Sequence, residues 1–320
     1  DSIYGVDGSP TVKDIFIDGQ WRTVLLSGVR QGGHAYFMLD ITNPDNPSHM
    51  FSFEHDELAN KVRYWDEDGN RTDYDVGSDI PDEYDYSDLG ESWSDPLILN
   101  LKINGLRKWV GVFGGGYNNN VNPNYGSVVY IIDLEDGGKI IEKIEIPDND
   151  AGDNITNSLP STISAITADS TNLISNAGAL LYFTDLEGSL WKINLTDQGT
   201  LYEATKLFDA DSSFDNDRMS FQKVSASVLY DKSLMTFYGT ANFAKISQQR
   251  DNIQNRVFAV KDENFPNFTQ ATELSESDLM EVTSLEQCFD SSDKCWFYNI
   301  EPNNQVTASS ALKKSWLKFT

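Results

Sequence analysis

The sequence predicts an all-β protein built as a β-propeller of four-stranded blades, with about four to five blades present. Two observations lead to this prediction. Short apolar runs alternate with turns rich in Gly and Asp, whereas helical periodicity is almost absent. The runs also recur in groups of four whose members keep the same order along the chain. Residues 1–320 are therefore expected to be part of one propeller domain.

The groups can be followed in order along the chain. Each group begins with a run introduced by small residues, at 9–17, 95–103, 164–169 and 225–231. A second apolar run follows at 23–29, 108–116, 179–185 and 234–240. The third passes through an aromatic residue toward Asp or Asn, at 33–41, 126–134, 188–195 and 255–262. The fourth lies at 48–54, 139–146, 200–208 and 295–300, and a fifth group begins within 309–319.

The spacing of the groups fits blades with loops of variable length. The group starts lie about 61 to 86 residues apart. A pair of β-sandwiches is the alternative, although a Greek key does not require the strand order to repeat. About four complete groups cannot close a ring when a fifth has only begun, and an open propeller would expose a sheet face. We therefore expect a longer polypeptide, with blades missing at one or both ends.

The stretch "ALLYFTDLEGSLWKINLTD" (179–197) is expected to be the middle of a blade. Gly188 would supply the turn between the second and third strands, and Leu190 and Trp191 would face opposite sides of the sheet. We interpret Trp191 as a residue that packs between blades. A Trp that stacks on a cofactor is the alternative.

Residues 56–87 are expected to form an inserted surface loop, acidic and rich in Tyr, that suits contact with a partner. Within it, "WDEDGNRTDYD" offers Asp66, Asp68, Asn70 and Asp73 as oxygen ligands. The Asp68-Gly69 pair reads equally well as a hairpin turn.

The charge of the chain restricts its partners. Asp and Glu outnumber Lys and Arg by 50 to 24, which gives a formal charge of -26. Such a field repels nucleic acid and anionic membranes, and it favours divalent cations and basic partners. No apolar run is long enough to span a bilayer, and no N-terminal signal is present.

Two cysteines, Cys288 and Cys295, flank the turn-forming stretch "CFDSSDKC". We predict a disulfide that clamps a hairpin in an oxidising compartment. Two reduced thiols in a cytosolic protein are the alternative. A zinc site is not favoured, because no His lies within about five residues of either Cys.

Residue patterns for catalysis are scarce, and we predict no catalytic residues. No nucleophile elbow, phosphate loop or zinc-protease motif occurs, and the three His (His34, His49 and His55) lie in one early region. The Gly-rich stretch 113–120 precedes a strand rather than a helix, so it is interpreted as a wide loop.

An acidic loop, "DADSSFDND", is the candidate metal site. Asp209, Asp211, Ser213, Asp215 and Asp217 stand at alternate positions, and a short loop of alternating oxygen ligands, here the four Asp, can wrap a calcium ion. The loop lacks the Gly that turns tight calcium loops at their sixth position. A solvated acidic hairpin is therefore the competing interpretation.

Several of these segments resemble one family. The run "VDGSPTVKDIFIDGQWRTVLLSGVRQGGHAYFMLDITNP" (6–44) is similar to the C-terminal propeller of the PilY/PilC proteins of type IV pili. So are "SDLGESWSDPLILNL" (87–101), "WVGVFGGGYN" (109–118), "LYFTDLEGSLWKINL" (181–195) and "NRVFAVKD" (255–262). These matches run in order over nearly the whole chain.

The resemblance implies a protein exported through the periplasm to the cell surface and located at the pilus tip. It implies roles in pilus assembly, adhesion and twitching, with pilin subunits or minor pilins and a host or abiotic surface as partners, and often with calcium. The family's calcium loop precedes the "DLEGSLW" strand pair. Here Asp169 matches its first ligand only if about two residues are inserted, and Ala179 replaces the closing Asp.

Three functions are carried forward from the sequence. The first is a non-enzymatic module for pilus biogenesis and adhesion. The second is a propeller dehydrogenase that uses a quinone, although the chain lacks the adjacent Cys pair of many such enzymes and a regular Trp in the fourth strands. The third is a periplasmic scaffold. The fold alone cannot choose among them.

Overall fold

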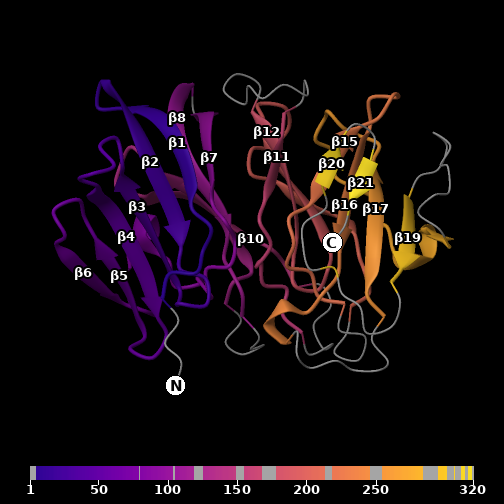
Figure 1. Ribbon diagram of the computed structural model, residues 1–320, viewed down its shortest axis with the longest axis horizontal. Coiled ribbons are helices and arrows are strands. Elements are labelled where there is room, and N and C mark those ends of the chain that lie inside the picture. The colour runs from indigo at the N-terminus through magenta and orange to yellow at the C-terminus, as the bar shows by residue number, and fades with distance from the viewer. Residues whose placement is uncertain are drawn as a thin grey trace. The chain divides into compact units, whose positions relative to one another are not determined.

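In the computed structural model, the regular secondary structure of the described residues is almost entirely β-strand (Figure 1). The structure describes residues 5–78, 80–103, 105–118, 125–148, 155–167, 178–212, 218–245, 254–283, 295–300, 306, 311–313 and 316–318. Within these residues, the helices are three short 3-10 turns at Asp82–Tyr84, Phe243–Lys245 and Glu276–Asp278. No helix in the described part of the chain is long and apolar enough to cross a membrane.

The strands form successive antiparallel sheets. The first sheet contains β1 (Thr11–Ile17), β2 (Gln20–Gly28), β3 (Ala35–Asp40), β4 (Ser48–Asp56), β5 (Lys61–Trp65) and β6 (Arg71–Asp75), in that order. The second contains β7 (Leu97–Ile103), β8 (Leu106–Gly114), β9 (Val128–Asp133) and β10 (Lys139–Glu145). The third contains β11 (Ser164–Ile166), β12 (Ala179–Thr184), β13 (Leu190–Leu195) and β14 (Ala204–Phe208).

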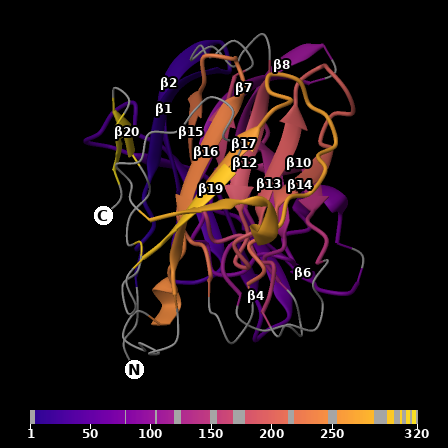
Figure 2. The same ribbon diagram turned by 90° about the vertical axis from the view of Figure 1, so that its right-hand side faces the viewer.

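The fourth sheet adds one strand to the four-stranded plan. It contains β15 (Ser225–Val228), β16 (Leu234–Gly239), β17 (Arg256–Asp262), β19 (Cys295–Asn299) and β18 (Met280–Val282), in that spatial order. Figure 2 labels the first four of these strands. Strand β18 pairs parallel to β19, and it lies outside the four runs predicted for this group. A two-stranded pair, β20 (Ala311–Lys313) and β21 (Trp316–Lys318), lies where the fifth group was expected.

The predicted all-β plan of four-stranded repeats is confirmed, because all four runs of each group are strands paired with their neighbours in chain order. Residues 56–87 differ from the surface loop that was expected. Their central part folds back as the hairpin β5–β6 and extends the first sheet. Val62 and Tyr64 point into the core from β5, so their burial stabilises the added hairpin.

The chain forms two compact units, residues 1–147 with 158–160 and residues 148–157 with 161–320. In the first unit, one face of the first sheet packs on the second sheet through a core of aromatic and aliphatic side chains. The rings of Phe53 and Tyr86 stack with centroids 3.6 Å apart, and those of Tyr36 and Phe113 stack at 4.1 Å. Stacked aromatic rings of this kind contribute more than their buried area alone.

In the second unit, the third and fourth sheets share a core that contains Tyr182, Leu190, Tyr238 and Phe258. A fully buried ion pair lies beside it. Lys192 Nζ is 2.6 Å from Asp262 Oδ2, and neither side chain is more than 1% exposed. The Tyr182 hydroxyl donates a hydrogen bond to the same carboxylate oxygen at 2.7 Å. The charges are therefore paired and hydrogen-bonded, as burial requires.

The turn expected at Gly188 is present, with φ +76° at that residue. Asp185 Oδ1 accepts a hydrogen bond from Ser189 N, and Asp185 Oδ2 accepts one from Trp191 Nε1 at 2.6 Å. Trp191 is 3% exposed, in agreement with its interpretation as a packing residue. Burial raises the pKa of Asp185 to about 8, against the lowering effect of the Trp191 hydrogen bond.

Candidate binding pocket on the first sheet

The first sheet has one buried face and one face that is largely uncovered. In β4, Phe51, Phe53 and His55 are buried, whereas the side chains between them are only partly buried. Because successive side chains in a strand point to opposite faces, this alternation marks a sheet covered on one side. We call the uncovered side the outer face.

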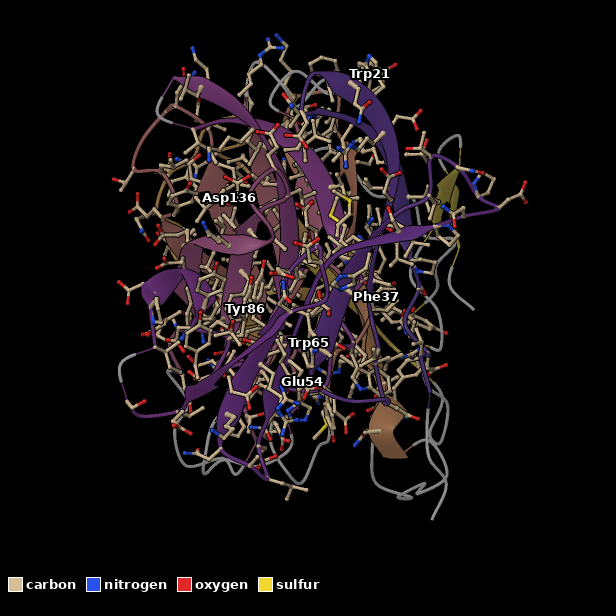
Figure 3. The ribbon with its side chains drawn as sticks, turned by 90° about the vertical axis from the view of Figure 1, so that its left-hand side faces the viewer. Trp21, Phe37, Glu54, Trp65, Tyr86 and Asp136 are labelled. Atoms are coloured by element: carbon tan, nitrogen blue, oxygen red, sulfur yellow. The ribbon has the colours of Figure 1, made fainter. Side chains whose placement is uncertain are left out.

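A row of side chains crosses the outer face. Phe37 of β3 pairs with Ser52 of β4, and Ser52 pairs with Trp65 of β5. The row next to it, Tyr36–Phe53–Tyr64, points into the core. Figure 3 shows Phe37, Glu54 and Trp65 on the face turned toward the viewer. The register of two hairpins therefore brings two aromatic side chains together on the outer face.

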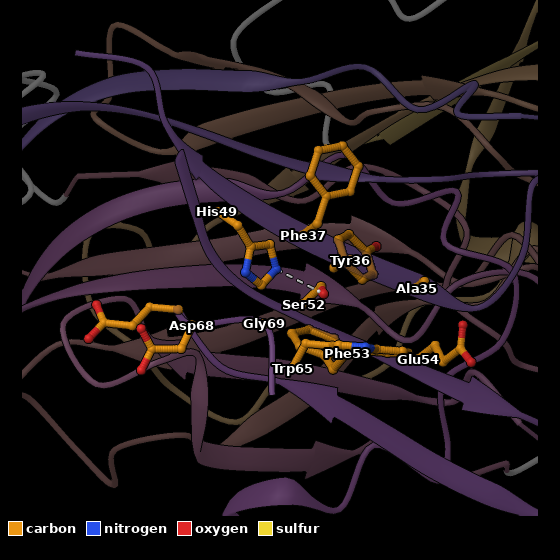
Figure 4. Close-up of a pocket in the computed structure, with 11 residues that line it drawn as sticks. Ala35, Tyr36, Phe37, His49, Ser52, Phe53, Glu54, Trp65, Asp68 and Gly69 are labelled. Carbon is orange, nitrogen blue, oxygen red and sulfur yellow. Dashed lines mark hydrogen bonds between the residues drawn. The ribbon is translucent and has the colours of Figure 1, made fainter. Parts of the chain in front are cut away.

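A pocket of about 520 Å³, here called the outer pocket, is lined by this row (Figure 4). Its walls come from β3, β4 and β5, and its rim includes the loop 66–70 that joins β5 to β6. The lining side chains on which the argument depends are Phe37, His49, Ser52, Glu54, Trp65 and the loop residues Glu67 and Asp68.

The loop 66–70 is held by its own hydrogen bonds. Asp66 Oδ1 accepts from Asn70 N at 2.8 Å, and Asp66 Oδ2 accepts from Asn70 Nδ2 at 3.0 Å. These bonds, led by the one from the Asn70 side chain, hold the pKa of Asp66 below its usual value. Gly69 completes the turn with φ +77°. Of the two sequence interpretations, the hairpin is present, and it is a five-residue loop rather than a two-residue turn.

The charges around the outer pocket are unequally balanced. At one end, Glu54 pairs with Arg63 at 2.5 Å. At the opposite end, the loop carries Glu67 and Asp68, which are both exposed. Figure 4 shows Asp68 at this end of the pocket. The ion pairs of the neighbouring Lys and Arg side chains go to other carboxylates, and none in the described residues reaches Glu67 or Asp68. This end of the pocket therefore carries an unbalanced negative charge.

Between the aromatic wall and the acidic loop lies His49. Its Nε2 is 3.0 Å from Ser52 Oγ (Figure 4). Its Nδ1 is buried and makes no hydrogen bond to the described residues. Among the described residues, no carboxylate hydrogen-bonds to this pair to orient it as in a catalytic triad.

The remaining His residues form a separate pair. The rings of His34 and His55 have centroids 5.9 Å apart, and His55 Nδ1 donates to the Leu89 carbonyl at 2.9 Å. Desolvation by burial lowers the pKa of His34. Within the described residues, no three His, Cys, Asp or Glu side chains converge as a metal site would require.

Only part of the predicted calcium loop can be placed. Asp209 Oδ2 pairs with Lys206 Nζ at 2.8 Å, and Asp209 Oδ1 accepts a hydrogen bond from Asp211 N at 2.8 Å. Asp215 and Asp217 lie outside the described residues, as do Asp169 and the other residues of 168–177. Calcium binding by this loop stays a prediction.

The predicted disulfide is likewise untested. Cys295 is the first residue of β19 and is buried, and its Sγ accepts a hydrogen bond from Lys261 N at 3.4 Å. Cys288 lies outside the described residues.

The order of the sheets and the shape of the repeats define the class of protein, an all-β propeller module. The chain belongs to the PilY1 beta-propeller domain family, whose family model matches residues 1–228.

The chain is similar to two curated relatives and to one solved structure. The type IV pilus biogenesis factor PilY1 homolog of Xylella fastidiosa is 30% identical over 198 residues, which cover 60% of this chain and 11% of that protein. PilY1 of Pseudomonas aeruginosa PAO1 is 33% identical over 190 residues, covering 59% of this chain and 13% of that protein. The crystal structure of the Pseudomonas aeruginosa PilY1 C-terminal domain matches with a TM-score of 0.67 at 19% identity, covering 96% of this chain and 65% of that one. The chain thus spans about an eighth of the curated relatives' length.

Proposed function

We propose that the protein acts in type IV pilus biogenesis as a non-enzymatic binding module at the cell surface, and that it supports adhesion at the pilus tip. The observation that carries this proposal is the family match over residues 1–228, since the matched relatives are named as pilus biogenesis factors. Pilin subunits or minor pilins, and a host or abiotic surface, are the proposed partners.

The outer pocket supports a binding role. It joins two aromatic side chains to unpaired carboxylates on a loop fixed by its own hydrogen bonds. Large amphipathic rings next to a few charged groups are typical of surfaces that recognise a partner.

The proposal also includes weak calcium binding at Asp209, Asp211, Asp215 and Asp217, and a bond between Cys288 and Cys295. Titration of the unfolded, unreduced protein with a thiol reagent tests the bond. We expect no free sulfhydryl, and two would contradict it.

The function is tested in the bacterium that carries the gene. An in-frame deletion of the codons for residues 1–320 is compared with the wild type and with a strain that is complemented in trans. We expect the deletion to reduce pilus number, twitching and surface attachment, and complementation to restore all three. Normal piliation and attachment in the deletion strain would overturn the proposal.

Two alternatives are separated by further measurements. A periplasmic scaffold would be absent from sheared pilus fractions, whereas a tip protein is recovered with them. A quinone-dependent dehydrogenase would carry a visible chromophore through purification.

A further inference from the structure

We infer that the outer pocket is a docking site for a basic side chain, preferentially Arg, presented by a protein partner. This inference rests on the proposed function, because it names the chemistry by which a partner would be recognised. Its three supports are the aromatic wall, the unbalanced charge of the rim and the fixed geometry of the loop.

The aromatic wall suits the body of a basic side chain. Phe37 and Trp65 lie in one cross-strand row with only Ser52 between them. A guanidinium stacks favourably on a Trp face, and its methylene stem can cover apolar surface while the charge stays near water. The same kind of contact already exists in this unit, where the Arg30 guanidinium lies 4.3 Å from the centroid of the Trp93 ring.

The acidic rim of the outer pocket favours a ligand that carries a positive charge. Glu67 and Asp68 have no cationic partner in the described residues, whereas Glu54 at the other end is paired with Arg63. A basic side chain entering beside Trp65 would therefore meet free carboxylates at the loop end only. Charge-assisted hydrogen bonds from a guanidinium to a carboxylate are among the stronger polar contacts in proteins.

The loop does not need to reorganise when it binds. Asp66 ties both of its carboxylate oxygens to Asn70, and Gly69 N donates to the Asp66 carbonyl at 3.0 Å. This network fixes the backbone that carries Glu67 and Asp68. Preorganisation of this kind reduces the entropy lost on binding.

A saccharide fits the pocket less well than a basic peptide. Sugar recognition needs several polar groups arranged around an aromatic platform. The aromatic wall here is made by Phe37 and Trp65, and the nearest polar pair, His49 with Ser52, is already hydrogen-bonded internally through His49 Nε2.

The test uses the purified protein and a labelled peptide in which a single Arg stands between Gly and Ser residues. Fluorescence anisotropy is compared with that of the same peptide carrying citrulline, which is neutral and nearly isosteric. We expect the Arg peptide to bind at least about tenfold more tightly, and to weaken as salt rises from about 50 mM to 500 mM. Equal binding of the two peptides would overturn the inference.

Matched variants locate the binding. Glu67→Gln with Asp68→Asn should weaken binding of the Arg peptide by about tenfold or more, because the double substitution removes the negative charge of the rim. Asp82→Asn with Glu83→Gln makes the same charge change at two exposed residues of the same unit that do not line the pocket. This control should bind as the wild type does. An equal loss in both pairs would assign the effect to the net charge of the protein and refute a site.

Trp65→Leu should also weaken the Arg peptide, with a far-UV spectrum and a melting temperature measured to show that the fold is kept. Hydroxyl-radical footprinting of the protein in cell extracts supplies the last check. We expect the Trp65 side chain to be oxidised when no peptide is present, because the pocket is open to solvent. If Trp65 is protected without peptide because another sheet of the same polypeptide covers the pocket, the inference is overturned. Because these assays measure binding and the genetic assay measures piliation, failure of one is distinguishable from failure of the other.

Discussion

Two hairpin loops, 66–70 in the first sheet and 185–189 in the third, share one backbone design in opposite surroundings. In both loops the first Asp accepts a hydrogen bond at Oδ1 from the residue four positions later, at 2.8 Å. In both, the Gly three positions after that Asp donates to its carbonyl and has φ near +76°. Asp66 lies in an exposed loop and its pKa is lowered, whereas Asp185 is buried and its pKa is raised.

The difference between these loops follows the difference between their sheets. Every residue of β12 and β13 is buried, whereas β3 and β4 are buried on alternate residues. The local pattern of Asp and Gly therefore determines the conformation of the turn. Whether the sheet is covered determines whether the turn packs in the core or faces solvent. The covered loop stabilises the core through Trp191, and the uncovered loop leaves Glu67 and Asp68 available to a ligand.

The largest expected effect comes from the charged pair of the covered sheets. Asp262→Ala would leave Lys192 buried without its counter-charge and would lower the free energy of unfolding by about 3–5 kcal/mol. In the first sheet, Glu54→Ala removes a partly exposed pair and should cost less than about 1 kcal/mol. Urea unfolding of both variants measures the contrast. Similar losses would show that the two sheets do not differ as their burial indicates.

The two glycines of the paired loops form the next contrast. A Cβ on Gly188 would lie 2.9 Å from the Arg218 carbonyl oxygen, whereas a Cβ on Gly69 would meet nothing within 4 Å. Gly69→Ala should therefore cost only the strain of positive φ, about 1–2 kcal/mol. Gly188→Ala should cost roughly 1–3 kcal/mol more, because the neighbouring chain must move. Thermal melts of the two variants test this, and equal shifts would contradict it.

The loops should also differ in their pH dependence. Because the folded pKa of Asp185 is raised from 3.8 to about 8, the folded protein holds a proton that the unfolded chain releases between these values. The contribution of Asp185 is therefore fully present below about pH 4 and is lost as pH rises toward 8, by up to about 1.4 kcal/mol per pH unit. Asp185→Asn should remove this part of the slope in urea unfolding measured from pH 4 to 8.

Asp66 provides the matched control for the pH experiment. Its pKa is lowered, so its contribution is present above its usual pKa and is lost on acidification. Asp66→Asn should therefore leave the slope between pH 4 and 8 unchanged. A slope that survives in Asp185→Asn would show that other groups produce it.

Features of the fold that depend on a short local sequence pattern could be predicted, whereas features that depend on distant strands could not. The turn at Gly188 was predictable because Asp and Gly stand between two apolar runs. The β5–β6 hairpin was missed although Val62 and Tyr64 alternate with polar residues, because Lys61, Arg63 and the acidic flanks dominate the segment. The outer pocket depends on the strand register that aligns Phe37, Ser52 and Trp65. The ion pair of Lys192 with Asp262 joins residues 70 positions apart in the sequence. Neither can be read from a single segment.

The smallest expected effect concerns calcium at the acidic loop after β14. Alternate carboxylates at Asp209, Asp211, Asp215 and Asp217 could converge on one ion, and neutralising them would relieve part of the -26 charge. Asp209 is already engaged by Lys206, which competes with a cation for the same oxygen. We therefore expect a Kd of about 10⁻⁴ to 10⁻³ M and a gain of only roughly 1 kcal/mol in the free energy of unfolding at millimolar calcium.

Thermal melts with and without calcium, repeated on Asp211→Ala with Asp215→Ala, measure this gain. The same double substitution at Glu67 and Asp68 controls for net charge and should keep the calcium shift. If the Asp211 and Asp215 variant keeps the whole shift instead, the ion binds elsewhere and this loop is only a solvated turn.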